Sequence, residues 1–401
     1  MSQNPVSLNS PNFGNTSYRV TGSPGLFVQG SQFIIGSNQT SSERSYVILK
    51  VLGRGAFSTV SFCDWQSPLP SSARFLRTPK FPTSNRIVAL KRARVTDADA
   101  PISTVPEILA LRTIPPHPNV IPLYDYFRPQ NSPSRDIYLV LEAMEGNLYQ
   151  LIRARRGRPL TPGLISFIFH QLALGLDHIH SHSFFHRDIM PENILVTTTG
   201  LGRYLTSADP GSTLRETDLV GVFKIGDFGA ARQTTSRPPY SEYIATRWYR
   251  APEVLLSSRT YNAAVDMWAL GAVMAEVVNL QPLFPGTDQV DQVSKICAVL
   301  GSPSSDSVFD DRGFPVGGGP WPAGISLGQS VGFQFPLVTA RPFYNHFGPS
   351  VNALLVECIR GLLLYDPQIR LSSRDCLDHP YFEETEVMRQ PLIQPVINLN
   401  Q

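Results

Sequence analysis

The sequence of 401 residues predicts an α+β protein in which a small sheet lobe precedes a large, mainly helical lobe. Two observations carry this prediction. Short runs of β-branched and aromatic residues, bounded by chain breakers, fill the first part of the chain and are typical of strands. Further along, apolar residues recur at intervals of three and four, which is the period of a helix. Strands first and helices afterwards is the order of the α+β class.

The first elements are three predicted strands that follow a polar arm. Residues 1–42 are rich in Ser, Asn, Gly and Pro and cannot bury enough apolar surface to offset the entropy of ordering, so we expect a disordered arm. Apolar runs at 46–53, 59–65 and 86–93 are the predicted strands. Between the last two, residues 66–86 are rich in Pro and Ser and predict a surface insertion.

Two long helices are predicted in the second part of the chain. Apolar residues keep the helical period from 164 to 179, after Thr161 as a plausible N-cap and Pro162 as the first helical residue. This pattern predicts a buried helix. Residues 263–280 are nearly all apolar, so we expect a second helix that lies deep in the larger lobe.

Charge and cysteine content exclude several classes of protein. The 34 basic and 32 acidic residues give a formal net charge of +2, which offers no electrostatic argument for nucleic acid or an anionic membrane as a partner. The four cysteines are widely spaced without a CxxC pair, which favours buried reduced thiols over a zinc site. The N-terminus lacks a signal-peptide pattern, and no run of about 18 apolar residues occurs. We therefore expect a cytoplasmic and/or nuclear protein.

A glycine-bearing segment lies between the first two predicted strands. LGRGAFSTV, at residues 52–60, includes Gly53 and Gly55, and glycines let backbone amides approach phosphate oxygens without a Cβ clash. Ser58 replaces the third glycine of the usual pattern. A glycine-bearing hairpin turn would explain the segment about as well.

Further motifs follow in a fixed order. VALK ends at Lys91, and Glu107 follows in PEILALR, where a short helix is plausible. HRDIMPEN occupies residues 186–193, and DFG begins at Asp227. Each charged residue alone could be a solvated surface group, but the combination is far more specific than any part.

Together these motifs resemble those of the eukaryotic protein kinases over about residues 46–383. The resemblance implies a bilobal fold with an N-lobe at about 43–143, built from a small antiparallel sheet and one helix. It also implies a mainly helical C-lobe at about 144–383 and a C-terminal tail at 384–401. ATP and Mg2+ are the implied cofactors, and proteins with Ser or Thr are the implied substrates.

The resemblance assigns the chemistry to a few polar side chains. Lys91 would hold the α and β phosphates and pair with Glu107. Asp188 would orient the substrate hydroxyl and accept its proton, and Asn193 and Asp227 would hold magnesium. Phosphoryl transfer needs charge neutralisation and in-line positioning more than covalent chemistry, so these groups and a metal suffice.

The same resemblance implies an adenine site and three structural supports. The adenine would contact the hinge Glu142 to Met144 and lie among apolar side chains, a set that simple core packing would also explain: Leu52, Val60, Ala89 and Leu195. The expected supports are His186, a buried ion pair of Glu253 with Arg370, and Asp266 as acceptor of hydrogen bonds from the catalytic-loop backbone.

The subfamily can be narrowed from further segments. WYRAPE at 248–253 and the segment that begins at Leu283 resemble the group of cyclin-dependent and MAP kinases. Within that group, NLYQLIR from Asn147 and the run 237–253 are similar to the male-germ-cell-associated kinases and their fungal meiosis-inducing relatives. The group implies proline-directed transfer to Ser or Thr.

These relatives carry a Thr-x-Tyr activation pair, and here the sequence is Ser241-Glu242-Tyr243. By family geometry a phosphate on Ser241 would lie close to Arg187 and order the loop through charge-assisted hydrogen bonds. Arg250 would pair with a phosphate on Tyr243. The resemblance therefore implies an upstream activating kinase, although both hydroxyls could be ordinary surface groups.

One position departs from the pattern in the catalytic motif itself. Met190 replaces a lysine that in Ser/Thr kinases contacts the transferring phosphate and the carboxylate at Asp188. Loss of such a contact could cost roughly 2–4 kcal/mol of transition-state stabilisation, so we expect slow turnover. A pseudokinase that acts as a signalling scaffold is the alternative.

Two other departures concern the helix of Glu107 and a long connection. Because proline is tolerated only in the first turn of a helix, Pro106 confines this helix to about residues 105–115. So short a helix offers little surface, and we do not expect a cyclin partner. Residues 197–222 precede DFG as a Gly-, Thr- and Ser-rich insertion that predicts a loop.

Overall fold

The computed structural model divides into two compact units. Unit 1 contains Met1–Leu109 and Pro122–Met144, and unit 2 contains Ala110–Ile121 and Glu145–Gln401. The residues that the structure describes are 16–19, 26–29, 32–35, 43–55, 58–76, 85–95, 101–129, 136–198, 221–236, 247–258, 260–304, 309–310 and 313–393. Unit 1 holds an antiparallel sheet and unit 2 holds most of the helices, which confirms the predicted fold class.

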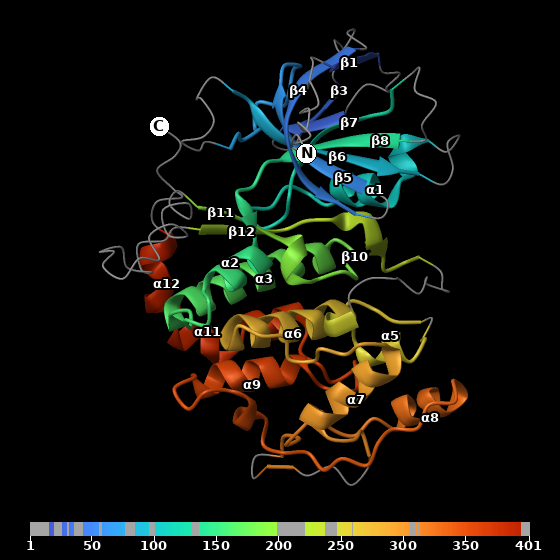
Figure 1. Ribbon diagram of the computed structural model, residues 1–401, viewed down its shortest axis with the longest axis vertical. Helices are drawn as coiled ribbons and strands as arrows, with labels where there is room; N and C mark the ends of the chain where they lie inside the picture. Colours follow the sequence, from blue (N-terminus) through green and yellow to red (C-terminus); the bar gives the residue numbers. More distant parts are fainter. Residues whose placement is uncertain are drawn as a thin grey trace, which may run out of the picture. The chain divides into compact units, whose positions relative to one another are not determined.

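Unit 1 is built on a six-stranded antiparallel sheet with the order β1-β4-β5-β6-β8-β7 (Figure 1). The three predicted strands are β4, β5 and β6. Two register shifts occur where β4 pairs with β5, and such irregularities bend a strand. The strand bounds are β1 (Thr16–Arg19), β4 (Glu43–Arg54), β5 (Ser58–Trp65), β6 (Ile87–Arg94), β7 (Leu123–Phe127) and β8 (Asp136–Glu142).

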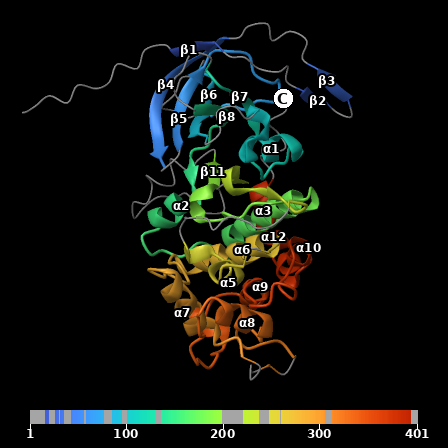
Figure 2. The ribbon, with the colours of Figure 1, turned by 90° about the vertical axis from the view of Figure 1, so that its right-hand side faces the viewer.

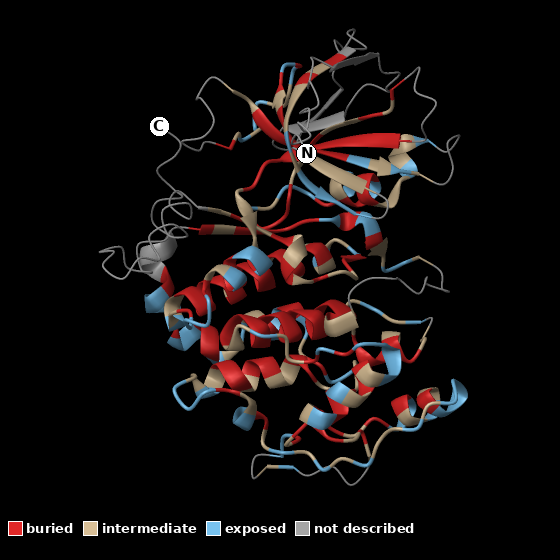
Figure 3. Ribbon diagram, in the orientation of Figure 1, coloured by how far each residue is buried: buried red, intermediate tan, exposed pale blue. Residues whose placement is uncertain are grey.

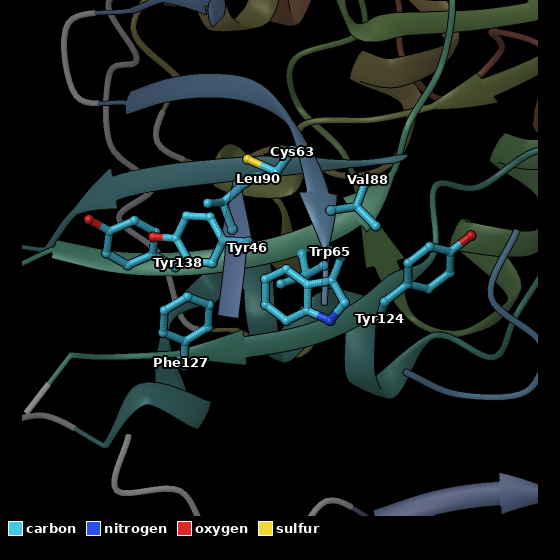
Figure 4. Packing of buried hydrophobic residues seen from close by; sticks show 9 residues of the cluster. Tyr46, Cys63, Trp65, Val88, Leu90, Tyr124, Phe127 and Tyr138 are labelled. Atoms are coloured by element: carbon cyan, nitrogen blue, oxygen red, sulfur yellow. The ribbon is translucent and has the colours of Figure 1, made fainter. Parts of the chain in front are cut away.

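An aromatic core packs on this sheet (Figure 4). The rings of Tyr46 and Trp65 stack with centroids 5.7 Å apart, and Phe127 stacks on Tyr138 at 5.0 Å. The alternate residues of β5 and β6 point into the same core, as the strand period of two requires. Its buried members are Tyr46, Cys63, Trp65, Val88, Leu90, Tyr124, Phe127, Tyr138 and Val140.

The first part of the 66–86 insertion packs onto this core. Leu69, Ala73 and Phe75 contact it as partly buried side chains. The hydroxyl of Tyr124 accepts a hydrogen bond from the Arg74 backbone N–H at 2.8 Å and donates to the Arg74 carbonyl at 3.0 Å. Residues 66–76 lie at the surface as predicted, with Gln66, Ser71 and Ser72 exposed, but they also pack on the sheet, and residues 77–84 lie outside the described part of the chain.

Three short strands occur within the predicted arm at 1–42. Strand β1 pairs with β4 at the edge of the sheet, and β2 (Leu26–Gln29) pairs with β3 (Gln32–Ile35). Disorder over the whole arm is thus too broad a prediction for these strands. The other residues of the arm lie outside the described ranges, and for them it stays a prediction.

Unit 2 is mainly helical (Figures 1 and 2). Helix α1 (Pro106–Thr113) begins in unit 1 and ends in unit 2, and its bounds agree with the short helix predicted from Pro106. The other helices are α2 (Leu148–Ala154), α3 (Pro162–Ser181), α5 (Pro252–Leu255), α6 (Ala264–Asn279), α7 (Gln289–Leu300), α8 (Pro322–Ser330), α9 (Ala353–Leu362), α10 (Ser373–Leu377), α11 (Pro380–Glu384) and α12 (Glu386–Ile393).

The two predicted long helices, α3 and α6, form the interior of unit 2. Helix α3 starts as predicted, because the Thr161 side chain accepts a hydrogen bond from the Leu164 N–H at 3.4 Å and proline follows Thr161. Helix α6 is buried along nearly its whole length (Figure 3), as its almost continuous apolar sequence requires. At Gly271 a Cβ atom would lie 2.9 Å from Leu362 Cβ, so glycine lets α9 pack closely against α6.

A small three-stranded sheet, with the order β12-β11-β9, lies in unit 2. It pairs β11 (Ile194–Thr198) with β12 (Gly221–Ile225) and with β9 (Gly146–Asn147). The ends of the predicted 197–222 loop therefore belong to strands, with Thr198 opposite Gly221. Residues 199–220 lie outside the described residues.

The predicted C-terminal tail contains helix α12, which packs beside α3 (Figure 2). Arg389 is only 5% exposed and donates to the hydroxyls of Ser166 and Thr385, both at 2.9 Å. It also donates to the Phe382 carbonyl at 2.8 Å, and its guanidinium lies over the ring of Phe382. Packing of unit 2 thus extends beyond the boundary predicted at residue 383.

The four cysteines are buried free thiols, as predicted. The sulfur atoms of Cys358 and Cys376 lie 3.9 Å apart without a disulfide bond. Within the described residues, no helix combines the length and the apolar character needed to cross a membrane.

We expect Arg389→Met to lower the free energy of unfolding by about 2–3 kcal/mol, because it removes a charged donor that three buried acceptors share. Urea denaturation of the purified protein measures the change. Arg374→Met is the matched control, since its side chain is 71% exposed and pairs only with Asp378, so it should change stability by less than about 0.5 kcal/mol. Equal effects of the two variants would contradict a role for Arg389 in anchoring α12.

Candidate active site

Unit 1 contains the predicted ion pair of Lys91 and Glu107. The Lys91 Nζ atom donates to both carboxylate oxygens of Glu107 at 2.8 Å. Both residues are buried, with 6% and 5% of their surface exposed. Lys91 lies on β6, and Glu107 lies in the first turn of α1, where a carboxylate also interacts favourably with the helix dipole. The pair is confirmed, and it fixes the position of the ammonium group.

The glycine-bearing segment joins β4 to β5 in the same unit. Gly53 pairs with Val60, and Val60 pairs with Lys91 on β6. A Cβ atom at Gly53 would meet nothing within 4 Å, so crowding does not require glycine there. At Gly55 the backbone N–H donates to the Ser58 carbonyl at 2.8 Å and closes a turn. A side chain at Gly53 would therefore project into open space, whereas one at Gly55 would contact Ser58 Oγ at 3.5 Å.

The other predicted adenine contacts in unit 1 lie in or next to the sheet. Glu142 and Met144, at the end of β8, are buried, and Ala89 pairs with Leu141 on β8. Leu52 is 42% exposed at the end of β4, which leaves its side chain accessible. Of these residues, Ala89 and Glu142 lie on the neighbouring strands β6 and β8, whereas Met144 follows the end of β8 and Leu52 lies on β4, which β5 separates from β6.

In unit 2, the catalytic motif brings Asp188, Asn193 and Asp227 together. The side-chain amide of Asn193 donates to the carbonyl of Asp188 at 2.8 Å and to its carboxylate at 2.9 Å. The short helix η2 (Pro191–Asn193) makes this reach possible by turning Asn193 back towards Asp188. Burial raises the pKa of the Asp188 carboxyl, and the charge of Asp227 acts in the same direction.

The oxygen atoms of this group fit a magnesium ion. Mg2+ prefers one or two carboxylates and takes its other ligands from water and phosphate oxygens. Two carboxylates that repel each other, next to an amide oxygen, form such a set. Among the described residues no cluster of three or more His, Cys, Asp and Glu could hold a metal ion.

Leu195 also lies in unit 2, on β11, next to the glycine that precedes Asp227. A Cβ atom at Gly226 would lie 2.8 Å from Leu195 Cδ1. The Gly226 N–H donates to the Asn193 carbonyl at 2.9 Å, so the DFG segment and the catalytic segment are bonded directly. Asp227 has a left-handed backbone with φ of 61°, and its side chain is the N-cap of the turn that follows.

Asp266 holds the backbone of the catalytic segment. Its carboxylate accepts hydrogen bonds from the N–H groups of His186 and Arg187, both at 2.7 Å, which confirms the prediction. Burial alone would raise the pKa of Asp266, but the hydrogen bonds and charges of His180 and His186 together outweigh it, so the pKa is lowered. Arg187 takes a φ of 73°, a strained value for a residue other than glycine, and the bond to Asp266 stabilises that conformation.

His186 and the pair of Glu253 with Arg370 are structural, as predicted. His186 accepts from the Asp188 N–H at 3.3 Å, and its other ring nitrogen lies 3.0 Å from the Gly226 carbonyl. Both ring nitrogens are therefore engaged. Arg370 donates to the two carboxylate oxygens of Glu253 at 2.9 and 3.1 Å, deep inside the unit.

Sequence reasoning missed a buried amide network that supports the same segment. The Asn119 side chain donates to Gln171 at 2.7 Å and to the Phe223 carbonyl at 2.9 Å. Gln171 also accepts from the Phe223 N–H at 3.0 Å, so α3 is joined to β12, the strand that leads to DFG. A polar glutamine inside the apolar run of α3 was the available signal.

The predicted phosphorylation sites Ser241 and Tyr243 lie outside the described residues. Burial and, to a smaller extent, the positive charge of Arg187 lower the pKa of Arg232, which lies on β13 (Arg232–Gln233). Arg187 also donates to the Ala230 carbonyl at 3.2 Å.

Comparison with known proteins identifies the family of this chain. The protein kinase domain family matches residues 78–382. The chain belongs to the protein kinase domain family. The glycine-bearing strands of the kinase precede the matched range, but they are paired in register with β6, which lies inside it.

Similar proteins fall within the predicted group of kinases. Cyclin-dependent kinase F-4 of Oryza sativa is 38% identical over 277 residues, which cover 69% of this chain and 51% of the relative. Serine/threonine-protein kinase MAK of Mus musculus is 37% identical over 272 residues, or 68% of this chain and 37% of the relative. The meiosis induction protein kinase of Saccharomyces cerevisiae is 33% identical and covers 86% of this chain and 56% of the relative. The chain therefore spans about half the length, or less, of these relatives.

We expect Asp266→Asn to destabilise the protein by about 3 kcal/mol, because the amide group cannot accept from both backbone N–H groups and one buried donor loses its partner. Urea denaturation measures the loss. Asp378→Asn is the matched control, since that side chain is 65% exposed and should change stability by less than about 0.5 kcal/mol. A wild-type midpoint for Asp266→Asn would contradict the supporting role.

Glu276 gives a prediction about pH. Burial raises its pKa to about 7, and the Tyr249 hydroxyl donates to it at 2.7 Å. Because the unfolded carboxyl ionises near 4.5, the stability that this group contributes is full below pH 4.5 and is lost as the pH rises through 7. Glu276→Gln should therefore gain roughly 2–3 kcal/mol relative to wild type between pH 5 and pH 8.

Urea denaturation of both proteins at several pH values tests this difference. Glu383→Gln, at an exposed position on α11, is the control and should run parallel to wild type. A pH-independent gap between Glu276→Gln and wild type would show that Glu276 is ionised in the folded protein throughout.

Proposed function

We propose that this protein is an ATP-dependent serine/threonine protein kinase that uses Mg2+. The observation that carries the proposal is the group of Asp188, Asn193 and Asp227, in which an amide fixes one carboxylate beside another. The buried pair of Lys91 with Glu107 adds support from unit 1.

Each residue has a role in this proposal. Asp188 orients the substrate hydroxyl and accepts its proton, while Asn193 and Asp227 hold Mg2+, which neutralises phosphate charge when bound. Lys91, positioned by Glu107, binds the α and β phosphates. The further ATP-binding residues are Leu52, Gly53, Gly55, Val60, Ala89, Glu142, Met144 and Leu195.

The substrates in this proposal are proteins with Ser or Thr followed by Pro, and the segments shared with the relatives support this choice. An upstream kinase activates the protein by phosphorylating Ser241 and Tyr243. The positive charge of Arg187 lowers the pKa of Arg232, and an anion such as a phosphate on Ser241 would relieve this repulsion between two cations.

Activation without a cyclin and a cytoplasmic and/or nuclear location complete the proposal. One relative is named as a cyclin-dependent kinase, but α1 has only 8 residues here and offers little surface. A tight cyclin complex recovered from cells would contradict this part of the proposal.

A second candidate function is a pseudokinase scaffold that binds nucleotide without turnover. Met190 favours it, since no ammonium group occupies that position next to Asp188.

We expect purified protein with ATP and Mg2+ to phosphorylate a Ser-Pro peptide, and Asp188→Asn to lower kcat roughly 10²–10⁴-fold because the proton acceptor is lost. Asp227→Asn should also abolish Mg2+-dependent transfer. Incorporation of labelled phosphate into the peptide measures turnover, and calorimetry measures ATP binding. A Ser-Ala peptide tests the preference for proline.

Asp378→Asn is the control, because its exposed carboxylate lies on the surface of unit 2. Bound ATP with no turnover above the two variants would establish the scaffold. Equal rates with both peptides would exclude the proline preference while leaving the kinase activity intact.

A further inference from the structure

Three histidines stack where residues 115–121 meet helix α3 in unit 2. The ring centroids of His117 and His178 are 4.5 Å apart, with an angle of 19° between the two planes. Those of His178 and His182 are 4.4 Å apart. None of the three has a role in the chemistry proposed for Asp188 and Lys91.

The hydrogen bonds of the three rings fix where their protons lie. Because a backbone carbonyl can only accept, His178 Nε2 donates to the Pro115 carbonyl at 2.8 Å, and His182 Nδ1 donates to the His178 carbonyl at 2.7 Å. Because a backbone N–H can only donate, His117 Nδ1 accepts from the Asn119 N–H at 3.1 Å. Neutral His117 therefore carries its proton on Nε2, and a second proton on Nδ1 would place two donors face to face.

Asn119 connects this segment to the strand that leads to DFG. Its side chain donates to the Phe223 carbonyl at 2.9 Å, and its own carbonyl accepts from the Ile225 N–H at 2.9 Å. The Ile121 N–H donates to the Ile225 carbonyl at 3.0 Å. Ile225 lies two residues before Asp227, so residues 115–121 support the end of β12 directly.

The titratable groups that face His117 come from two elements. Asp177, His178 and His182 lie on α3 or at its C-cap, and Lys224 lies on β12. Burial is the main influence and lowers the pKa of His117 to about 4. The charges of the other two histidines and of Lys224 lower this pKa as well, whereas the charge of Asp177 raises it. His117 is therefore neutral near pH 7.

We propose that His117 is a proton-sensitive contact, which keeps residues 115–121 docked on α3 and β12 while its ring is neutral and releases them when Nδ1 is protonated. Proton uptake forms an N–H bond at Nδ1 and breaks the hydrogen bond from Asn119. In the released segment the imidazolium is hydrated and no longer faces a donor. Acid should thus loosen the support of β12. This contact is a property of the folded chain and does not depend on the proposed kinase activity.

Acid favours the released segment because only that state takes up the proton readily. The released ring has the ordinary pKa of 6.5, whereas the docked ring has a pKa of about 4. The docked state is therefore fully favoured above pH 6.5 and loses stability as the pH falls from 6.5 towards 4. Between pH 7.5 and pH 5.5 the ratio of released to docked segment should rise roughly tenfold.

Hydrogen exchange of the whole protein, followed by mass spectrometry, measures this ratio. Prolines occupy positions 115, 116, 118 and 122, so within this stretch only His117, Asn119, Val120 and Ile121 carry an exchangeable amide. We expect the protection factor, which is the chemical exchange rate divided by the measured rate, to fall roughly tenfold from pH 7.5 to pH 5.5.

His117→Asn removes the titration and keeps the acceptor, because an asparagine side chain can accept from the N–H two residues on. We expect its protection factor to change less than about threefold between the two pH values. His379→Asn is the matched control, since His379 Nδ1 accepts from the Tyr381 N–H at 3.2 Å in the same pattern. That variant should keep the wild-type fall in residues 115–121.

His178→Phe is the second variant and serves also if His117→Asn does not fold. Phenylalanine keeps a ring against His117 but cannot donate to Pro115, so protection should be lower at both pH values while the roughly tenfold fall remains. Loss of the fall in His178→Phe would assign the proton to His178 and overturn the role of His117. An equally steep fall in His117→Asn, or a wild-type protection factor that does not change with pH, would overturn it too.

Discussion

Asp266 joins the catalytic segment to the interior of unit 2. Its carboxylate is fully buried on α6, yet it accepts from two consecutive backbone N–H groups and from His180 on α3. A carboxylate without these donors would be very costly in such surroundings, so the helix and the segment stabilise each other. The hydrogen bond from the Arg187 N–H to Asp266 also holds the strained backbone conformation of Arg187. Because Asp188 directly follows Arg187, this conformation determines how the backbone of Asp188 is oriented.

The same principle recurs at other buried charges of the protein. Lys91 is satisfied by Glu107, Arg370 by Glu253, and Arg389 by two hydroxyls and a carbonyl. Each cation is buried and has two or more acceptor atoms, so its position is defined within narrow limits. Asp188 and Asp227 are the contrast, because their charges repel one another, which suits a place where a cation and phosphates are to bind.

Much of this arrangement could be predicted from local patterns. The strands β4, β5 and β6 and the helices α3 and α6 each carry a clear apolar period, and Thr161 with Pro162 marks the start of α3. The motif residues and their ion pairs followed from resemblance, because their order along the chain is specific. The contacts of Leu69 and Phe75 could not be predicted, since a Pro- and Ser-rich segment gives no local sign of what it packs against. The same holds for α12, whose docking depends on one arginine and two hydroxyls far apart in the sequence.

The strand pair β11 and β12 has a consequence for how this fold can vary. The last described residue of β11, Thr198, is opposite Gly221, the first residue of β12, in the ladder. Asn193 and Asp227 adjoin the other end of the same pair, where Ile194 is paired with Ile225. Because the entropy of closing a loop grows only slowly with its length, a doubling costs about 0.6 kcal/mol. Evolution, or an engineer who inserts a reporter domain, can therefore lengthen the chain at this point while the register that aligns the polar residues at the far end is retained.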